Sequence, residues 1–323
     1  VTVTVKPAPK IFNPGEKKKC GDENGNATFN LTSYNAAVSG GVGVVTWYTD
    51  AAGTMPLSPA GAYVVNISAN PTKVYAKVTN NGCSSVLQEV TLTVLPFPVI
   101  VNGIEDERCK VVGGLTVFSL PPLAKLVNGG STDVVKWSTD PLGNSPINGT
   151  THGVNATTNI YASVTNAEGC VAGPVPVKLI VNRLPDITIN PTNPTYCAGD
   201  SVAPLASVFN GTPDYTYLWK LPNNSLVKDT NTIFAKTPGN YLVTVTDAKG
   251  CSRAVSKAVT EMASPKAVIT PASSVICKDS TITINLNVTG GNPGYTYNWK
   301  SPDSSFVGSN SYLASSAGTY SIT

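Results

Sequence analysis

The chain has 323 residues, a length that suits two to four domains of ordinary size. Charged residues make up 13% and the net charge is only +3, which argues against a nucleic-acid partner. The 41% share of hydrophobic residues can build cores, so long disorder is not expected. One histidine and two methionines leave little material for metal or acid–base chemistry, and no apolar run is long enough to span a membrane.

The first segment, residues 1–6, reads VTVTVK and alternates apolar and polar side chains, as a half-buried strand does. Its sequence resembles the VTLTVLP stretch that begins at Val90. We therefore expect residues 1–6 to be the last strand of a preceding repeat, and the parent protein to extend beyond both ends of this sequence.

Four tryptophans recur along the chain at intervals of 90, 82 and 80 residues, one per repeat: Trp47, Trp137, Trp219 and Trp299. Such a period indicates tandem repeats. Because the tryptophan returns at one position in every repeat, we expect it to anchor the core between two sheets. A sugar-stacking platform on the alternating strand Tyr215, Tyr217, Trp219 is the alternative.

Within each repeat the pattern is one of short alternating strands separated by Pro, Gly and Asn clusters, with no sustained helical period. We predict an all-β chain of tandem immunoglobulin-like antiparallel β-sandwiches arranged as an elongated rod, with minimal helix. Proline-bearing junctions divide it after the segment 1–6 into repeats 7–96, 97–184, 185–263 and 264–323, the last truncated.

The repeats fall into two pairs. When the strands before the three Gly-Cys turns are aligned, Tyr75 and Tyr161 fall one residue later than Tyr241. A shift of one residue moves a side chain to the other face of a sheet. We therefore expect repeats one and two to form one pair and repeats three and four another, with the tyrosines of the two pairs on opposite sheet faces.

Cysteines flank the first three tryptophans in the order Cys, Trp, Cys, and the fourth repeat has only the leading Cys277. We predict one disulfide within each repeat, namely Cys20–Cys83, Cys109–Cys170 and Cys197–Cys251, with the partner of Cys277 beyond the end. Such bonds imply an oxidising compartment. Reduced buried cysteines and zinc ligation are the alternatives, and zinc is disfavoured because no CxxC occurs.

No catalytic constellation is evident, so we predict no enzyme, no cofactor and no metal. His152 lies in a loop pattern and is expected to be solvated. Asp50 and Asp140 follow their tryptophans at the same offset, and we expect each to accept hydrogen bonds within its own turn. For three other aspartates, Asp200, Asp247 and Asp279, calcium binding is the alternative, and it is disfavoured because no dense carboxylate loop occurs. The run EKKK before Cys20 is expected to be a solvated approach to that cysteine.

The later repeats, with GTPDYTYLWK followed by PGNYLVTVTDAKGC and again GGNPGYTYNWK with AGTYSIT, resemble the PKD-like (SprB-type) repeats of Bacteroidetes surface adhesins. The earlier ones, with WYTDAAGTMPLSP, KVYAKVTNNGC and VTLTV, resemble the Ig-like repeats of the same secreted proteins. The resemblance implies β-sandwich modules at the cell surface, export by the type IX secretion system, and a role in gliding motility or attachment.

The resemblance also implies partners among surface glycans, other cell-surface proteins, or outer-membrane motility or secretion machinery. It suggests O-glycosylation at Ser201 and Ser280, which follow aspartates in DSV and DST; a plain turn serine is the alternative. We expect a structural and adhesive stalk on the extracellular, outer-membrane-associated cell surface. Carbohydrate-binding or spacer modules of a secreted polysaccharide-degrading enzyme are the alternative.

Overall fold

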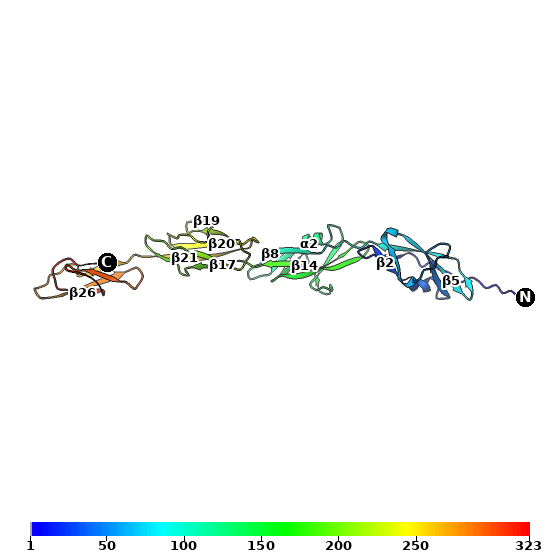
Figure 1. The fold of residues 1–323 in the computed structure, drawn as a ribbon, viewed down its shortest axis with the longest axis horizontal. Coiled ribbons are helices and arrows are strands. Elements are labelled where there is room, and N and C mark those ends of the chain that lie inside the picture. The colour runs from blue at the N-terminus through cyan, green and yellow to red at the C-terminus, as the bar shows by residue number, and fades with distance from the viewer. Residues whose placement is uncertain (1) are drawn as a thin grey trace. The chain divides into compact units, whose positions relative to one another are not determined.

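In the computed structural model, which describes residues 2–323 except the side chain of Phe306, the chain folds as tandem β-sandwiches of immunoglobulin-like type (Figure 1). The predicted all-β class of tandem immunoglobulin-like sandwiches is confirmed. The chain divides into two compact units, residues 1–181 and 182–323. Each unit holds two sandwiches, and each sandwich has its own buried apolar cluster.

The first sandwich pairs a larger sheet of order β1-β7-β5-β3, with β6 beside β5, and a two-stranded sheet β2-β4. Its strands and helix are β1 Lys17–Cys20, β2 Asn26–Phe29, α1 Asn35–Ser39, β3 Val44–Tyr48, β4 Tyr63–Asn66, β5 Thr72–Asn80, β6 Cys83–Ser84 and β7 Gln88–Leu95, with 3-10 turns at Leu31–Tyr34, Ala60–Ala62 and Ile67–Ala69.

The second sandwich has a five-stranded sheet of order β11-β10-β13-β14-β8 and a pair β12-β9. Its elements are β8 Ile104–Cys109, β9 Thr116–Ser119, α2 Leu120–Val127, β10 Val134–Ser138, β11 Pro146–Ile147, β12 Thr151–Val154, β13 Thr158–Thr165 and β14 Val171–Asn182. The sequence predicted minimal helix, and α2 is an exception to that prediction. Its prolines lie in the first turn, where the missing N–H groups cost nothing, and Leu123 and Val127 face the core.

The third sandwich has a five-stranded sheet of order β16-β21-β20-β18-β19 and a pair β15-β17. Its strands are β15 Asp186–Asn190, β16 Thr195–Cys197, β17 Leu205–Phe209, β18 Thr216–Lys220, β19 Leu226–Lys228, β20 Gly239–Thr246 and β21 Ser252–Met262.

The fourth sandwich has two three-stranded sheets, β22-β23-β26 and β25-β24-β27. Its strands are β22 Lys266–Thr270, β23 Ile282–Thr289, β24 Tyr297–Lys300, β25 Ser305–Gly308, β26 Ser311–Ala314 and β27 Ser321–Ile322.

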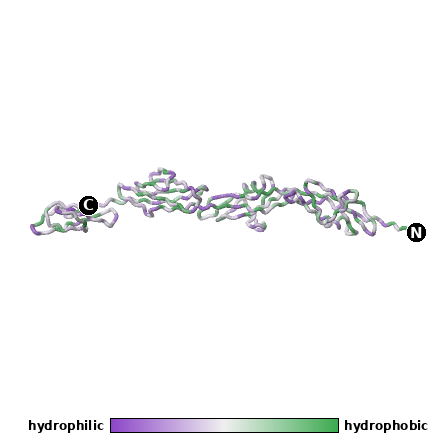
Figure 2. Tube along the Cα trace, in the orientation of Figure 1, coloured by the Kyte–Doolittle hydropathy of each residue, from purple (hydrophilic) through white to green (hydrophobic). Residues whose placement is uncertain are grey.

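The four tryptophans occupy one structural position. Each pairs across its sheet with a later strand of its own repeat: Trp47 with Ala76, Trp137 with Ala162, Trp219 with Val243 and Trp299 with Ile322. All four side chains are buried, at 8% exposure or less. Figure 2 shows hydrophobic and hydrophilic residues interleaved along the strands, the pattern of a sheet with one face on a core.

The tyrosine offset has the structural effect that the alignment predicts. Tyr241 is buried and donates its hydroxyl to the carbonyl of Thr237 at 2.9 Å, and Tyr320 donates to Ser316 at 2.8 Å. This is the tyrosine corner of Greek-key sandwiches. In the first two repeats Val74 and Ile160 fill the core position, and their tyrosines are half-buried on the other face.

Candidate functional site: the junction between the first two repeats

The first half of the junction is the strand β1, which carries Cys20. β1 runs parallel to β7, the closing strand of the first sandwich, and Cys20 lies opposite Leu95. Lys18 and Lys19 are exposed, as the sequence suggested for this run, and Lys17 is half-buried. Lys17 lies 5.0 Å from the Tyr34 ring centroid, and Lys19 donates to the Thr28 carbonyl at 2.6 Å. Cys20 is thus held at the end where β7 leaves the sandwich.

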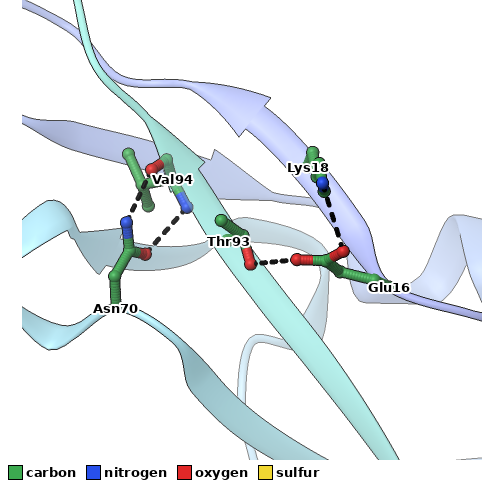
Figure 3. Close-up of polar contacts among 5 residues, drawn as sticks. All are labelled: Glu16, Lys18, Asn70, Thr93 and Val94. Carbon is green, nitrogen blue, oxygen red and sulfur yellow. Dashed lines mark hydrogen bonds and ion pairs between the residues drawn. The ribbon is translucent and has the colours of Figure 1, made fainter. Parts of the chain in front are cut away.

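Side chains on both flanks hold β7 in place (Figure 3). Glu16 accepts a hydrogen bond from the Thr93 hydroxyl at 2.5 Å and forms an ion pair with Lys18 at 3.3 Å. The Thr93 hydrogen bond lowers the pKa of the Glu16 carboxyl below its usual range. On the other flank the Asn70 amide donates to the Val94 carbonyl at 2.6 Å and accepts from the Val94 amide at 2.9 Å. Asn70 therefore binds β7 as a further strand would.

The second half of the junction is the turn between β13 and β14, which carries Cys170. The Asn166 side chain accepts a hydrogen bond from the Cys170 amide at 2.9 Å, and Gly169 has φ +82°, a left-handed conformation that suits glycine. The Asn166 amide also donates to the carbonyl of Pro96, in the linker, at 2.8 Å. Cys170 itself is 1% exposed.

A disulfide joins the two halves: Cys20 bonds to Cys170, 150 residues away in sequence and in the next sandwich. Their Cα atoms lie 5.6 Å apart, within the usual range for a disulfide. The predicted pairings Cys20–Cys83 and Cys109–Cys170 are therefore wrong.

The directions of the strands explain why the predicted Cys20–Cys83 pairing is wrong. β5 is antiparallel to β7 and β1 is parallel to it, so Cys83 lies near the start of β7 and Cys20 near its end. Eight residues of strand separate them by roughly 25 Å, far beyond the reach of a disulfide. The two cysteines of the predicted Cys20–Cys83 pair thus lie at opposite ends of the sandwich.

A parallel strand pair also shows that the third predicted pairing, Cys197–Cys251, is wrong. Cys197 ends β16, which is parallel to β21 and pairs with Met262, whereas Cys251 directly precedes β21. Cys197 is a free thiol, as are Cys83 and Cys277, whereas Cys109 and Cys251 are disulfide-bonded. Cys83 directs its thiol to the Lys6 carbonyl at 3.8 Å.

The turn aspartates act as the sequence indicated. Asp50 accepts hydrogen bonds from the Thr54 and Met55 amides, and the Thr54 amide is the main cause of its lowered pKa. At Asp140 burial raises the pKa, but hydrogen bonds led by that of the Ser138 hydroxyl outweigh it and lower the pKa well below its usual range. Asp247 binds the amide of Cys251 at 2.8 Å in the third repeat, as Asn166 binds Cys170.

The remaining candidate residues belong to neither β1, β7 nor the turn between β13 and β14. Ser201 and Ser280 are exposed, and their glycosylation stays a prediction. His152 is half-buried on β12. Tyr215 and Tyr217 pack against the cluster that holds Trp219. Over residues 2–323 no three His, Cys, Asp or Glu side chains gather where they could hold a metal ion.

Sequence reasoning missed Asn166 and Asn70. The recurring spacing in NAEGC and DAKGC carried the signal for the first, because both turns place a short polar side chain four residues before the cysteine. Asn70 had no such signal, since its partner is the backbone of a strand 24 residues later.

The fold and the junction define a chain of tandem Ig-like repeats in which a disulfide crosses from one repeat to the next. Residues 16–98 match the model of the Flavobacterium inter-domain disulphide bond domain. This match supports the coarser resemblance, to Ig-like repeats of Bacteroidetes proteins. No curated protein matches the sequence.

Solved structures that are similar to the chain are tandem Ig domains. The I67–I69 fragment of titin has 13% identity and a TM-score of 0.34, with 80% of this chain and 99% of that chain covered. The N-terminal eight Ig domains of Down Syndrome Cell Adhesion Molecule have 14% identity and a TM-score of 0.35, with 90% and 41% covered. Domains 3–5 of Drosophila OTK have 12% identity and a TM-score of 0.28, with 80% and 99% covered.

Proposed function

We propose that this chain is a structural stalk segment of an extracellular adhesive protein, in which disulfides that cross from repeat to repeat keep the stalk connected under tension. The observation that carries the proposal is the Cys20–Cys170 bond. Tension applied to the chain on either side of it passes through the two sulfur atoms, so residues 21–169, including the linker after Pro96, are bypassed.

The surroundings of the bond fit this role. Cys20 lies in a strand paired along its length with β7, and Cys170 is buried in a turn fixed by Asn166. Closing a loop of this length raises the free energy of the unfolded chain by about 5 kcal/mol on the entropic model. The bond thus stabilises both repeats as well as connecting them.

The pairing follows a rule that we propose for the whole array: the first cysteine of one repeat bonds to the Gly-Cys cysteine of the next. Cys83 is a Gly-Cys cysteine and Cys197 and Cys277 are first cysteines, and all three are free thiols. Under this rule their partners belong to neighbouring repeats, not to their own.

Disulfides favour an oxidising, extracellular location, and within residues 2–323 no helix is both long and apolar enough to cross a membrane. The finer parts of the proposal come from the resemblance to SprB-type repeats: type IX export, attachment to the outer-membrane surface, gliding or adhesion, and binding to glycans or cell-surface proteins. The proposal assigns no catalytic step to any residue.

The proposal is tested by cutting the linker between the first two repeats while the chain is held under tension. A protease site inserted between Asn102 and Gly103 is cleaved while the chain is held by its two ends in magnetic tweezers. We expect the tether to survive cleavage and to break only when a reductant is added. A Cys20→Ser variant with the same site is the matched control and should break on cleavage. Rupture of the parent tether on cleavage would refute the proposal.

A further inference from the structure

Asn166 is a side chain of the second repeat that binds the backbone of both halves of the junction. Its oxygen accepts a hydrogen bond from the Cys170 amide at 2.9 Å, which holds the turn of the second repeat. Its amide nitrogen donates to the carbonyl of Pro96 at 2.8 Å, 70 residues earlier in the sequence. Pro96 directly follows β7, the closing strand of the first repeat. The acceptor and the donor of one amide group therefore serve different repeats.

Cys20 is fixed to the same stretch of backbone. It lies opposite Leu95 in the parallel pair of β1 and β7, and the amide of the next residue, Gly21, donates to the Leu95 carbonyl at 2.9 Å. The carbonyl that Asn166 binds belongs to the residue after Leu95. Two consecutive carbonyls thus connect the backbone at Cys20 with the backbone at Cys170, and none of these contacts uses a sulfur atom.

The third repeat contains a natural variant of this turn. Asp247 occupies the place of Asn166, four residues before the Gly-Cys cysteine, and accepts a hydrogen bond from the Cys251 amide at 2.8 Å. Its second carboxylate oxygen accepts from the Thr212 amide of its own repeat at 3.0 Å. A carboxylate has no N–H group to donate. Aspartate is therefore sufficient for the turn, whereas binding the Pro96 carbonyl requires the asparagine amide.

We propose that Asn166 is a positioning residue for the formation of the crossing bond: it aligns the buried Cys170 with the exposed Cys20 and so selects this pair. Because its N–H group binds the first repeat, it raises the effective concentration of one thiol at the other. This inference rests on the bond itself and not on the proposed stalk function.

The oxidant in this reaction is a small-molecule disulfide such as glutathione disulfide. The thiolate of the exposed Cys20 attacks one of its sulfur atoms, the S–S bond of glutathione disulfide breaks, and one glutathione thiolate leaves. The thiolate of Cys170 then attacks the Cys20 sulfur of the mixed disulfide and releases the second glutathione. Two electrons pass from the cysteines to glutathione, and the two glutathione thiolates take up the two thiol protons. Asn166 acts in the second step, because it holds Cys170 beside Cys20.

The test measures the equilibrium of the Cys20–Cys170 bond with glutathione in the full chain, by trapping the thiols and quantifying each cysteine peptide by mass spectrometry. Asn166→Asp keeps the acceptor for the Cys170 amide and loses the donor to Pro96. We expect it to lower the effective concentration of the pair by at least about threefold, the order of one lost hydrogen bond, with more glutathione left on Cys20. Ala167→Asp adds the same charge to the same exposed turn and should change this value less than about twofold.

Hydrogen exchange of the Cys170 amide separates positioning from a purely structural role. We expect Asn166→Asp to keep the protection of this amide, because the acceptor oxygen remains. Three results would overturn the proposal. One is a smaller fall in effective concentration than expected, and another is an equal fall in Ala167→Asp. The third is a fall accompanied by loss of protection at the Cys170 amide, which would mean that Asn166 only holds its own turn.

Discussion

Asp140 shows how one side chain sets the shape of a turn in this fold. It follows Trp137 by three residues, and its carboxylate accepts hydrogen bonds from the Ser138 hydroxyl and the Leu142 amide, both at 2.9 Å. Asp50 holds the same place after Trp47. The two carboxylates close the loops that follow β3 and β10, the strands that carry Trp47 and Trp137, which explains why the motif recurs without any shared ligand.

The lowered pKa of Asp140 gives a prediction with a definite sign. Because the folded pKa lies below the ordinary aspartate value of about 3.9, the stabilising contribution is present above about pH 4 and is lost as pH falls through the folded pKa. Calorimetry should show Asp140→Asn melting about 5 °C below the parent at pH 7. The difference in melting temperature between Asp140→Asn and the parent should narrow below pH 4. Asp133→Asn, outside this loop, is the control, and an equal effect there would contradict the account.

At the scale of single elements, Asn70 makes two side-chain hydrogen bonds to the backbone of Val94, near the end of the closing strand β7. Asn70→Asp keeps the acceptor for the Val94 amide but loses the donor to the Val94 carbonyl. We expect destabilisation of the first repeat by about 1 kcal/mol, measured by chemical denaturation. An unchanged midpoint would mean that water replaces the Asn70 amide at no cost.

The tyrosine corner gives a second test at this scale. Tyr241→Phe removes only the hydroxyl that donates to the Thr237 carbonyl, so we expect a loss of about 1 kcal/mol in the third repeat. Tyr161→Phe is the matched control, because the Tyr161 side chain is half-buried on the other face of its sheet and its hydroxyl makes no hydrogen bond within the described residues. Similar losses in both variants would contradict the distinction between the two pairs of repeats.

Much of the architecture was accessible from the sequence because it depends on local periodicity. Alternation in stretches such as Tyr215–Trp219 and the 80–90 residue spacing of the tryptophans were sufficient to predict β-sandwiches. Disulfide pairing depends instead on strand direction. Which end of the sandwich holds Cys20 follows from the parallel pairing of β1 with β7, and no alternation pattern encodes that.

At the scale of the whole molecule, the disulfide between repeats determines whether each repeat is stable independently of its neighbour. A sandwich closed by its own disulfide would be an independent bead, whereas Cys20 makes the first repeat depend on the second. Removing this bond with Cys20→Ser/Cys170→Ser should therefore lower the melting temperatures of both repeats. A melting change confined to one repeat would show that they unfold independently.

A peptide map under non-reducing conditions, after alkylation of free thiols, tests the crossing disulfide most directly. The account predicts a peptide pair that joins Cys20 to Cys170, with alkylated Cys83, Cys197 and Cys277. A peptide pair that joins Cys20 to Cys83 would contradict it.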